Sequence, residues 1–187
     1  NIANCMSNGL SARQLQLSNT FRRLWFEHVM WTRSFIISAI FGLPDLDVVT
    51  KRLLRNPDDF GTALRQFYES QRAMKFGELL SDHLLIAGQI VTAAKAGDTQ
   101  KVEDERVKWY ANADEIADFL SSINPFWSKT TWQALLYDHL RMVEEEAARI
   151  LTGKYEDSIT GYDAMQAEAL DMADYMTCGI IRQFMIR

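Results

Sequence analysis

Three histidines are the residues whose type and placement in this sequence point most directly to chemistry. They are the only histidines of the chain, and each lies in a different segment with helical periodicity. The positions three and four residues to either side of each one are mostly apolar, and residues at these spacings share one face of a helix. Each imidazole should therefore point into the core. The three residues are His28, His83 and His139.

Counting residues along the predicted helices places these histidines at a similar height. His83 lies about 14 residues before the turn that ends its helix, and His139 lies about as far beyond the turn that begins its own, roughly 21 Å in each case. Asn112, on the helix between them, matches both heights and could complete the layer or hydrogen-bond within it. His28 is also in the middle of its helix. We therefore expect a single histidine layer.

Such a layer predicts a metal site. Imidazole nitrogen suits zinc, iron, copper and nickel, and three histidines leave a coordination position open for water or substrate. We expect iron or zinc, with Glu146 and Glu168 as further candidate ligands and Asp171 as a supporting polar residue. Glu146 shares the face of His139, but seven residues place it about 10 Å further along the helix, so it would serve a second site or a polar network.

Arg33 is a second supporting polar residue, because apolar residues surround it at helical spacing. A buried guanidinium needs an acidic partner. We expect that partner to be Asp171 or Asp174 on the last helix, with an anion-binding role as the alternative.

The metal hypothesis has two competitors. The chain lacks the spacings E-x-x-H, H-x-x-x-H and H-E-x-x-H that mark familiar helical metal sites. A metal-free histidine layer in a non-enzymatic interaction or structural protein therefore stays open, as does a bundle that holds an apolar ligand. No phosphate-binding glycine loop or serine elbow is present, so an enzymatic activity and a small-molecule ligand are left unassigned.

The composition is that of one globular domain. The chain has 187 residues, of which 48% are hydrophobic and 24% charged, with a net charge of −5. Acids and bases alternate along it, which argues against a nucleic-acid partner. The most apolar run, 34–43, is about half the length of a membrane span, and the first residues do not resemble a secretion signal. We expect a cytoplasmic protein without a membrane partner, and a homodimer as the oligomer to consider.

The elements that must position the histidines are all helices. We expect a disordered segment over 1–11 and a single helical-bundle domain over 12–187. The predicted fold is an up-and-down bundle of four to five long helices, with two short helices in the first connection separated by Asn56-Pro57, where the asparagine acts as a helix cap. The long helices are expected over 12–42, 70–96, 99–122, 129–152 and 158–184, and the short ones over 45–55 and 58–68.

Several short segments carry a family resemblance. They are Leu24-Trp25 with His28, Trp31-Thr32-Arg33, Leu43-Pro44-Asp45, Ala94-Lys95-Ala96-Gly97-Asp98, Asn112-Ala113-Asp114-Glu115-Ile116, Asn124-Pro125, Met172-Ala173-Asp174 and Gly179-Ile180. On these segments, residues 18–185 resemble an uncharacterised family of small all-helical bacterial proteins, known mainly from Gram-positive, spore-forming lineages. The resemblance implies a helical bundle of loosely ferritin- or haemerythrin-like architecture and no assigned activity.

Overall fold

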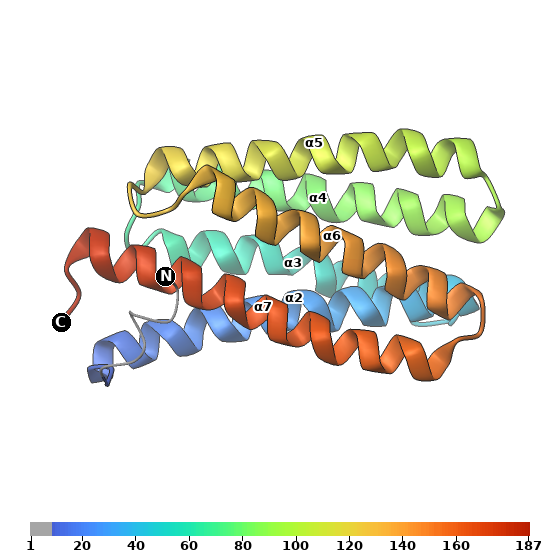
Figure 1. Cartoon of the computed structure of the whole chain (residues 1–187), viewed down its shortest axis with the longest axis horizontal. Helices are drawn as coiled ribbons and strands as arrows, with labels where there is room; N and C mark the ends of the chain where they lie inside the picture. The colour runs from blue at the N-terminus through green and yellow to red at the C-terminus, as the bar shows by residue number, and fades with distance from the viewer. Residues whose placement is uncertain (1–8) are drawn as a thin grey trace.

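The protein is a bundle of α-helices that run along the long axis of the molecule (Figure 1). The computed structural model describes residues 9–187, and in this range the regular elements are six helices and no strands, which confirms the predicted all-α class. Ser11 caps the first of them, and residues 1–8 of the predicted disordered segment lie outside the described residues. The helices are α2 (Ala12–Phe41), α3 (Leu46–Leu64), α4 (Ser70–Ala96), α5 (Thr99–Ile123), α6 (Lys129–Leu151) and α7 (Tyr155–Phe184).

The helices form three successive hairpins. Each helix packs against the next along the chain, and α7 returns to pack against α2. The links α2–α3, α4–α5 and α6–α7 lie at one end of the bundle, and the other two links lie at the opposite end (Figure 1). Because α2 also contacts α4 and α6, the first arms of the three hairpins meet in the interior.

The main departure from the sequence-based expectation is α3. The prediction of two short helices separated at Asn56-Pro57 is wrong, because α3 runs unbroken through Pro57. The described range therefore has six long helices and not four to five. A proline inside a helix costs roughly 3 kcal/mol, because it removes a backbone hydrogen bond. Phe60 and Leu64, further along α3, are fully buried, and each such side chain contributes about 1.5–3 kcal/mol. Packing therefore outweighs the local preference for a break.

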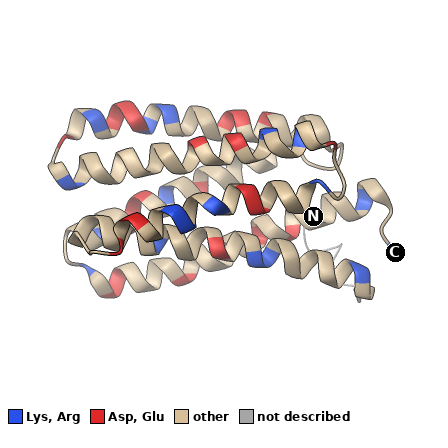
Figure 2. Cartoon of the chain, turned by 180° about the vertical axis from the view of Figure 1, so that it is seen from behind, with Lys and Arg blue, Asp and Glu red and all other residues tan. Residues whose placement is uncertain are grey.

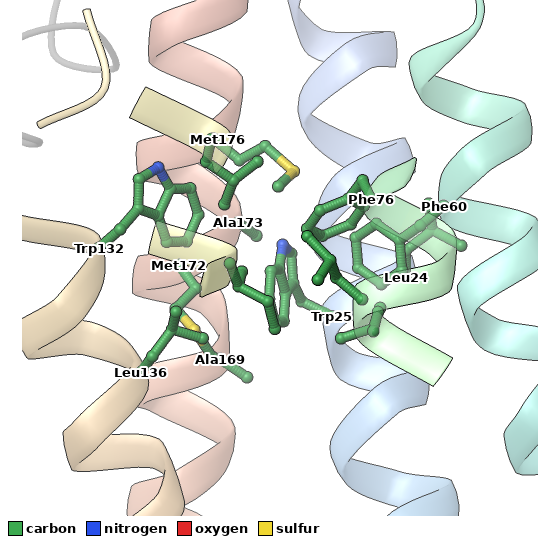
Figure 3. Close-up of a cluster of buried hydrophobic side chains, with 14 of the residues drawn as sticks. Leu24, Trp25, Phe60, Phe76, Trp132, Leu136, Ala169, Met172, Ala173 and Met176 are labelled. Carbon is green, nitrogen blue, oxygen red and sulfur yellow. The ribbon is translucent and has the colours of Figure 1, made fainter. Parts of the chain in front are cut away.

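A cluster of buried hydrophobic side chains, several of them aromatic, packs between the helices (Figure 3). Trp25 of α2 is stacked on Trp132 of α6 with ring centroids 6.3 Å apart, and it meets Phe60 of α3 edge-on at 5.0 Å. Phe60 in turn lies 5.6 Å from Phe76 of α4. These contacts set the positions of four helices relative to one another. They also position His28, whose ring lies 5.7 Å from that of Trp25.

Charged residues lie along the outside of the bundle. Lysine and arginine alternate with aspartate and glutamate on the helices, and no face in this view carries one sign alone (Figure 2). None of the helices in the described range combines the length and the apolar character that a bilayer span requires.

Candidate metal centre

The three histidines meet in one buried layer inside the bundle. His28 comes from α2, His83 from α4 and His139 from α6, and each is only 1–2% exposed. The ring centroids are 5.6 to 6.5 Å apart, and one ring nitrogen from each residue lies within 4.8 Å of the other two. The predicted common layer is therefore confirmed, and the three side chains are close enough to bind one metal ion.

In the first hairpin, Asn56 of α3 determines which nitrogen of His28 faces the centre. The Asn56 amide nitrogen Nδ2 donates to the backbone carbonyl of Leu24 at 3.0 Å, so its oxygen Oδ1 faces the ring nitrogen Nδ1 of His28, also at 3.0 Å. An amide oxygen only accepts hydrogen bonds, so Nδ1 must carry the proton. The other ring nitrogen, Nε2, is then the one with a lone pair for a metal.

The second hairpin repeats this arrangement. Asn112 of α5 donates from Nδ2 to the carbonyl of Leu79 at 3.0 Å and accepts at Oδ1 from Nδ1 of His83 at 3.0 Å. As in the first hairpin, that carbonyl belongs to the residue four positions before the histidine. Trp109 of α5 adds a hydrogen bond from its indole to the His83 carbonyl at 3.0 Å. Of the two roles expected for Asn112, it therefore takes the one of a hydrogen-bond partner within the layer.

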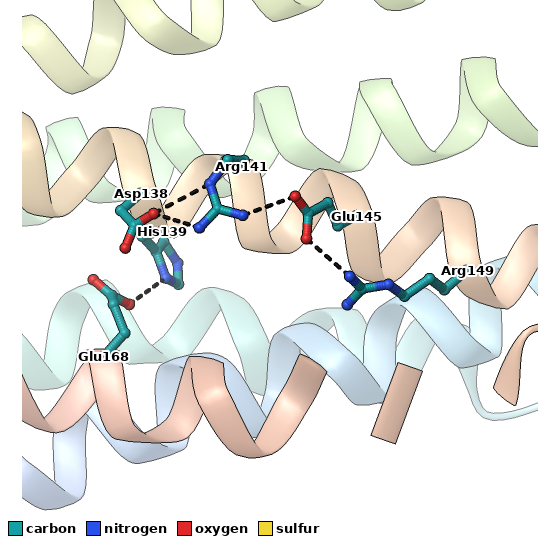
Figure 4. A network of polar contacts seen from close by, with 6 residues as sticks. All are labelled: Asp138, His139, Arg141, Glu145, Arg149 and Glu168. Atoms are coloured by element: carbon teal, nitrogen blue, oxygen red, sulfur yellow. Dashed lines mark hydrogen bonds and ion pairs between the residues drawn. The ribbon is translucent and has the colours of Figure 1, made fainter. Parts of the chain in front are cut away.

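The third hairpin has a carboxylate in the same place. Oε2 of Glu168, on α7, lies 3.1 Å from Nδ1 of His139 (Figure 4). A carboxylate oxygen accepts the Nδ1 proton just as the amide oxygens do, which again leaves Nε2 of His139 for the centre. That Nε2 and Oε1 of Glu168 are both buried and have no hydrogen-bond partner among residues 9–187. Glu168, predicted as a metal ligand, thus orients His139.

These contacts belong to a threefold repeat along the chain. The histidines are 55 and 56 residues apart, the acceptors that orient them are 56 residues apart, and a glycine with left-handed backbone, φ 63° to 73°, follows each histidine by 14 residues at the hairpin turn. The repeated positions are His28, His83 and His139, then Gly42, Gly97 and Gly153, then Asn56, Asn112 and Glu168. This spacing is the signal that could have found Asn56 from sequence, where a helix-cap role was predicted instead.

Burial favours the neutral form of two of the three rings, those of His28 and His83. Burial, and to a smaller extent the neighbouring His139, lower the pKa of His28 to about 3, against the opposing effect of the hydrogen bond to Asn56. The pKa of His83 is also well below its ordinary value, first through burial and then through the two other histidines. Neutral imidazole is the form that binds metal ions, so neither ring has to lose a proton first.

Arg33 and Glu146 form a polar network outside the layer. Arg33 donates from Nη1 to Oε1 of Glu146 and, at 2.9 Å, to Oγ of Ser158, and its guanidinium lies 5.0 Å from the ring centre of Tyr162. Burial raises the pKa of Glu146, and Arg33 opposes that shift. Of the two roles expected for Glu146, the structure therefore supports the polar network. The expected ion pair between Arg33 and an acid of the last helix is wrong.

The acids expected to pair with Arg33 lie elsewhere. Asp171 is exposed and does not join the layer, and Asp174 binds Arg22 through two hydrogen bonds of 2.6 and 2.7 Å. Asp138, which precedes the third histidine, turns outward and pairs with Arg141 on the surface of α6 (Figure 4). A difference of one residue rotates a side chain by about 100° around a helix, which separates Asp138 from the layer that His139 joins.

Comparison with models of protein families, with curated proteins and with solved structures finds no match to this chain. Its function has to be argued from the geometry of the histidine layer itself.

Proposed function

We propose that this protein binds one transition-metal ion, iron or zinc, through Nε2 of His28, His83 and His139. The observation that carries the proposal is the combination of three ring nitrogens, one from each histidine and within 4.8 Å of one another, with an acceptor at Nδ1 of every ring. Metal-binding histidines almost always donate their other N–H to a carboxylate, a carbonyl or water, because that contact fixes the tautomer and the ring orientation.

The chemistry of the donors supports a metal more than a simple polar layer. Within the described part of the chain, Nε2 of His139 is buried without a hydrogen-bond partner, which costs free energy unless a ligand compensates it. Zinc–nitrogen bonds of about 2.0–2.1 Å place tetrahedral ligand nitrogens about 3.4 Å apart. An ion at the centre would therefore draw the three rings slightly inward.

A metal held by three imidazoles keeps at least one coordination position for an exogenous ligand. Water, dioxygen or another small molecule could occupy it, so the proposal covers oxygen binding, redox chemistry and metal handling. Tryptophan rings line part of the layer, with Trp25 at 5.7 Å from His28 and Trp109 at 5.2 Å from His83. Bulky neighbours of this kind favour a small ligand.

Metal analysis of protein expressed without a histidine tag tests the proposal. We expect about one equivalent of iron or zinc per chain by plasma mass spectrometry, and loss of that metal when the three histidines are changed to glutamine. Cys178→Ala is the matched control, because it removes a potential soft ligand about 15 Å along α7 from Glu168 and should leave the metal content unchanged.

Wild-type protein that stays metal-free after incubation with iron and zinc salts, with a stability that does not respond to chelators, would contradict metal binding. That result would favour the alternative function, a non-enzymatic interaction or structural protein with a buried histidine layer. Retention of metal by the triple glutamine variant would show that the ion binds elsewhere.

A further inference from the structure

The threefold repeat isolates Glu168 as the position where the third hairpin differs from the other two. Asn56 and Asn112 each make two hydrogen bonds, one to the histidine and one to the backbone carbonyl four residues before it. Glu168 keeps the contact with His139, but its second oxygen is buried and has no partner among the residues that the structure describes. An asparagine at this position could accept from the histidine and donate to the backbone carbonyl, as in the other two hairpins. The fold alone therefore gives no reason for a carboxylate.

Glu168 also lacks a counter-charge from the protein. It is 7% exposed, and among the described residues its ionic neighbour is His139, with no lysine or arginine paired to it. The other buried carboxylate of this region, Glu146, has Arg33 as its partner. A buried carboxylate without a cation is unfavourable. The missing cation would be supplied on the far side of the His139 ring, where the proposed metal binds.

We propose that Glu168 gives the centre its preference for a divalent over a monovalent metal ion. This inference rests on the proposed metal binding. The attraction between the carboxylate and the ion is proportional to the charge of the ion, so a divalent ion gains about twice as much as a monovalent one. With asparagine in all three hairpins the ligand set would be neutral, and this part of the preference would disappear.

Zn²⁺ and Cu⁺ are suitable probes. Both have filled d shells, so neither has a geometric preference from its d electrons, and they differ chiefly in charge and softness. The variant Glu168→Gln keeps the length of the side chain and its acceptor oxygen for His139, but removes the charge. We expect it to weaken Zn²⁺ binding about 10–100-fold, the usual effect of losing such a partner. Because a monovalent ion loses half as much interaction free energy, Cu⁺ binding should weaken by the square root of that factor, about 3–10-fold.

The control is Glu145→Gln, which removes a carboxylate from the surface of α6, where it pairs with Arg141 and Arg149 (Figure 4). It should leave both affinities unchanged. If Glu168→Gln does not fold by circular dichroism, Glu168→Asn takes its place, because the other two hairpins already use asparagine at this position.

Competition titrations with chromogenic chelators, anaerobic for Cu⁺, give both affinities for each variant. A fall in the ratio of Zn²⁺ to Cu⁺ affinity of about threefold or more supports the inference. Equal weakening for both ions leaves the ratio unchanged, shows that Glu168 only orients His139 and overturns the inference. Unchanged affinities for both ions overturn it as well. A wild-type protein that binds neither ion instead refutes the proposed function, so the two failures can be told apart.

Discussion

The role of the asparagines in the layer can be tested by removing one of them. Asn112→Ala eliminates two hydrogen bonds of 3.0 Å, one with His83 and one with the carbonyl of Leu79. The Nδ1 proton of His83 is then buried without an acceptor, which costs about 1–3 kcal/mol, and the lost bond to the carbonyl adds about 1 kcal/mol. We therefore expect the free energy of unfolding of the metal-free protein to fall by about 2–4 kcal/mol.

Urea unfolding with EDTA present measures this loss. Asn56→Ala should cost a similar amount, because Asn56 makes the same two contacts with the same distances in the first hairpin. Asn19→Ala is the matched control, since Asn19 lies on the exposed face of α2. A change at such a surface position stays within about 0.5 kcal/mol.

The same two variants should bind metal about 10–100-fold more weakly, because their histidine is no longer held in the tautomer that presents Nε2. The reasoning would be refuted by Asn56→Ala and Asn112→Ala proteins that unfold with the stability of Asn19→Ala. It would also be refuted if only one of the pair were destabilised, since the repeat implies equal roles.

Three further outcomes follow from buried groups. Burial lowers the pKa of His28 from 6.5 to about 3, so between these values only the unfolded chain binds the proton. From this residue the free energy of unfolding, measured in urea with EDTA, should therefore fall by about 2 kcal/mol between pH 7 and pH 5. His28→Gln removes this contribution. Gly179→Ala places a Cβ atom on the indole of Trp127 and should lower the stability in thermal unfolding by about 1–3 kcal/mol. Arg33→Met leaves the buried Glu146 unpaired and should cost about 3–5 kcal/mol in urea unfolding, which the added change Glu146→Leu largely restores.

The positions of the helices and the burial of the histidines could be predicted from the sequence. The neighbours of His83 and His139 at three and four residues are apolar, and this pattern depends only on the helical period, which is a local property. Counting residues between turns was enough to predict a common height for these two rings. The turns themselves follow from glycine, as at Gly97, whose left-handed φ of 73° disfavours other residues.

Other features depended on contacts between helices. Arg33 pairs with Glu146 of α6 and not with an acid of α7, because the register of α2 against its neighbours decides which acid it can reach. The break expected at Pro57 is absent from α3, because burial of the apolar residues that follow outweighs the lost hydrogen bond. Neither result follows from local preference.

The sequence alone determined that this protein is helical and that three imidazoles point inward, because side-chain direction on a helix repeats with a fixed period. Which nitrogen of each ring carries the proton follows from the packing of the helices against one another. That choice depends on a hydrogen bond to a residue 28 or 29 positions further along, on the second arm of the same hairpin. A contact of this kind exists only when the two arms pack in one register, and the packing of the whole core selects that register.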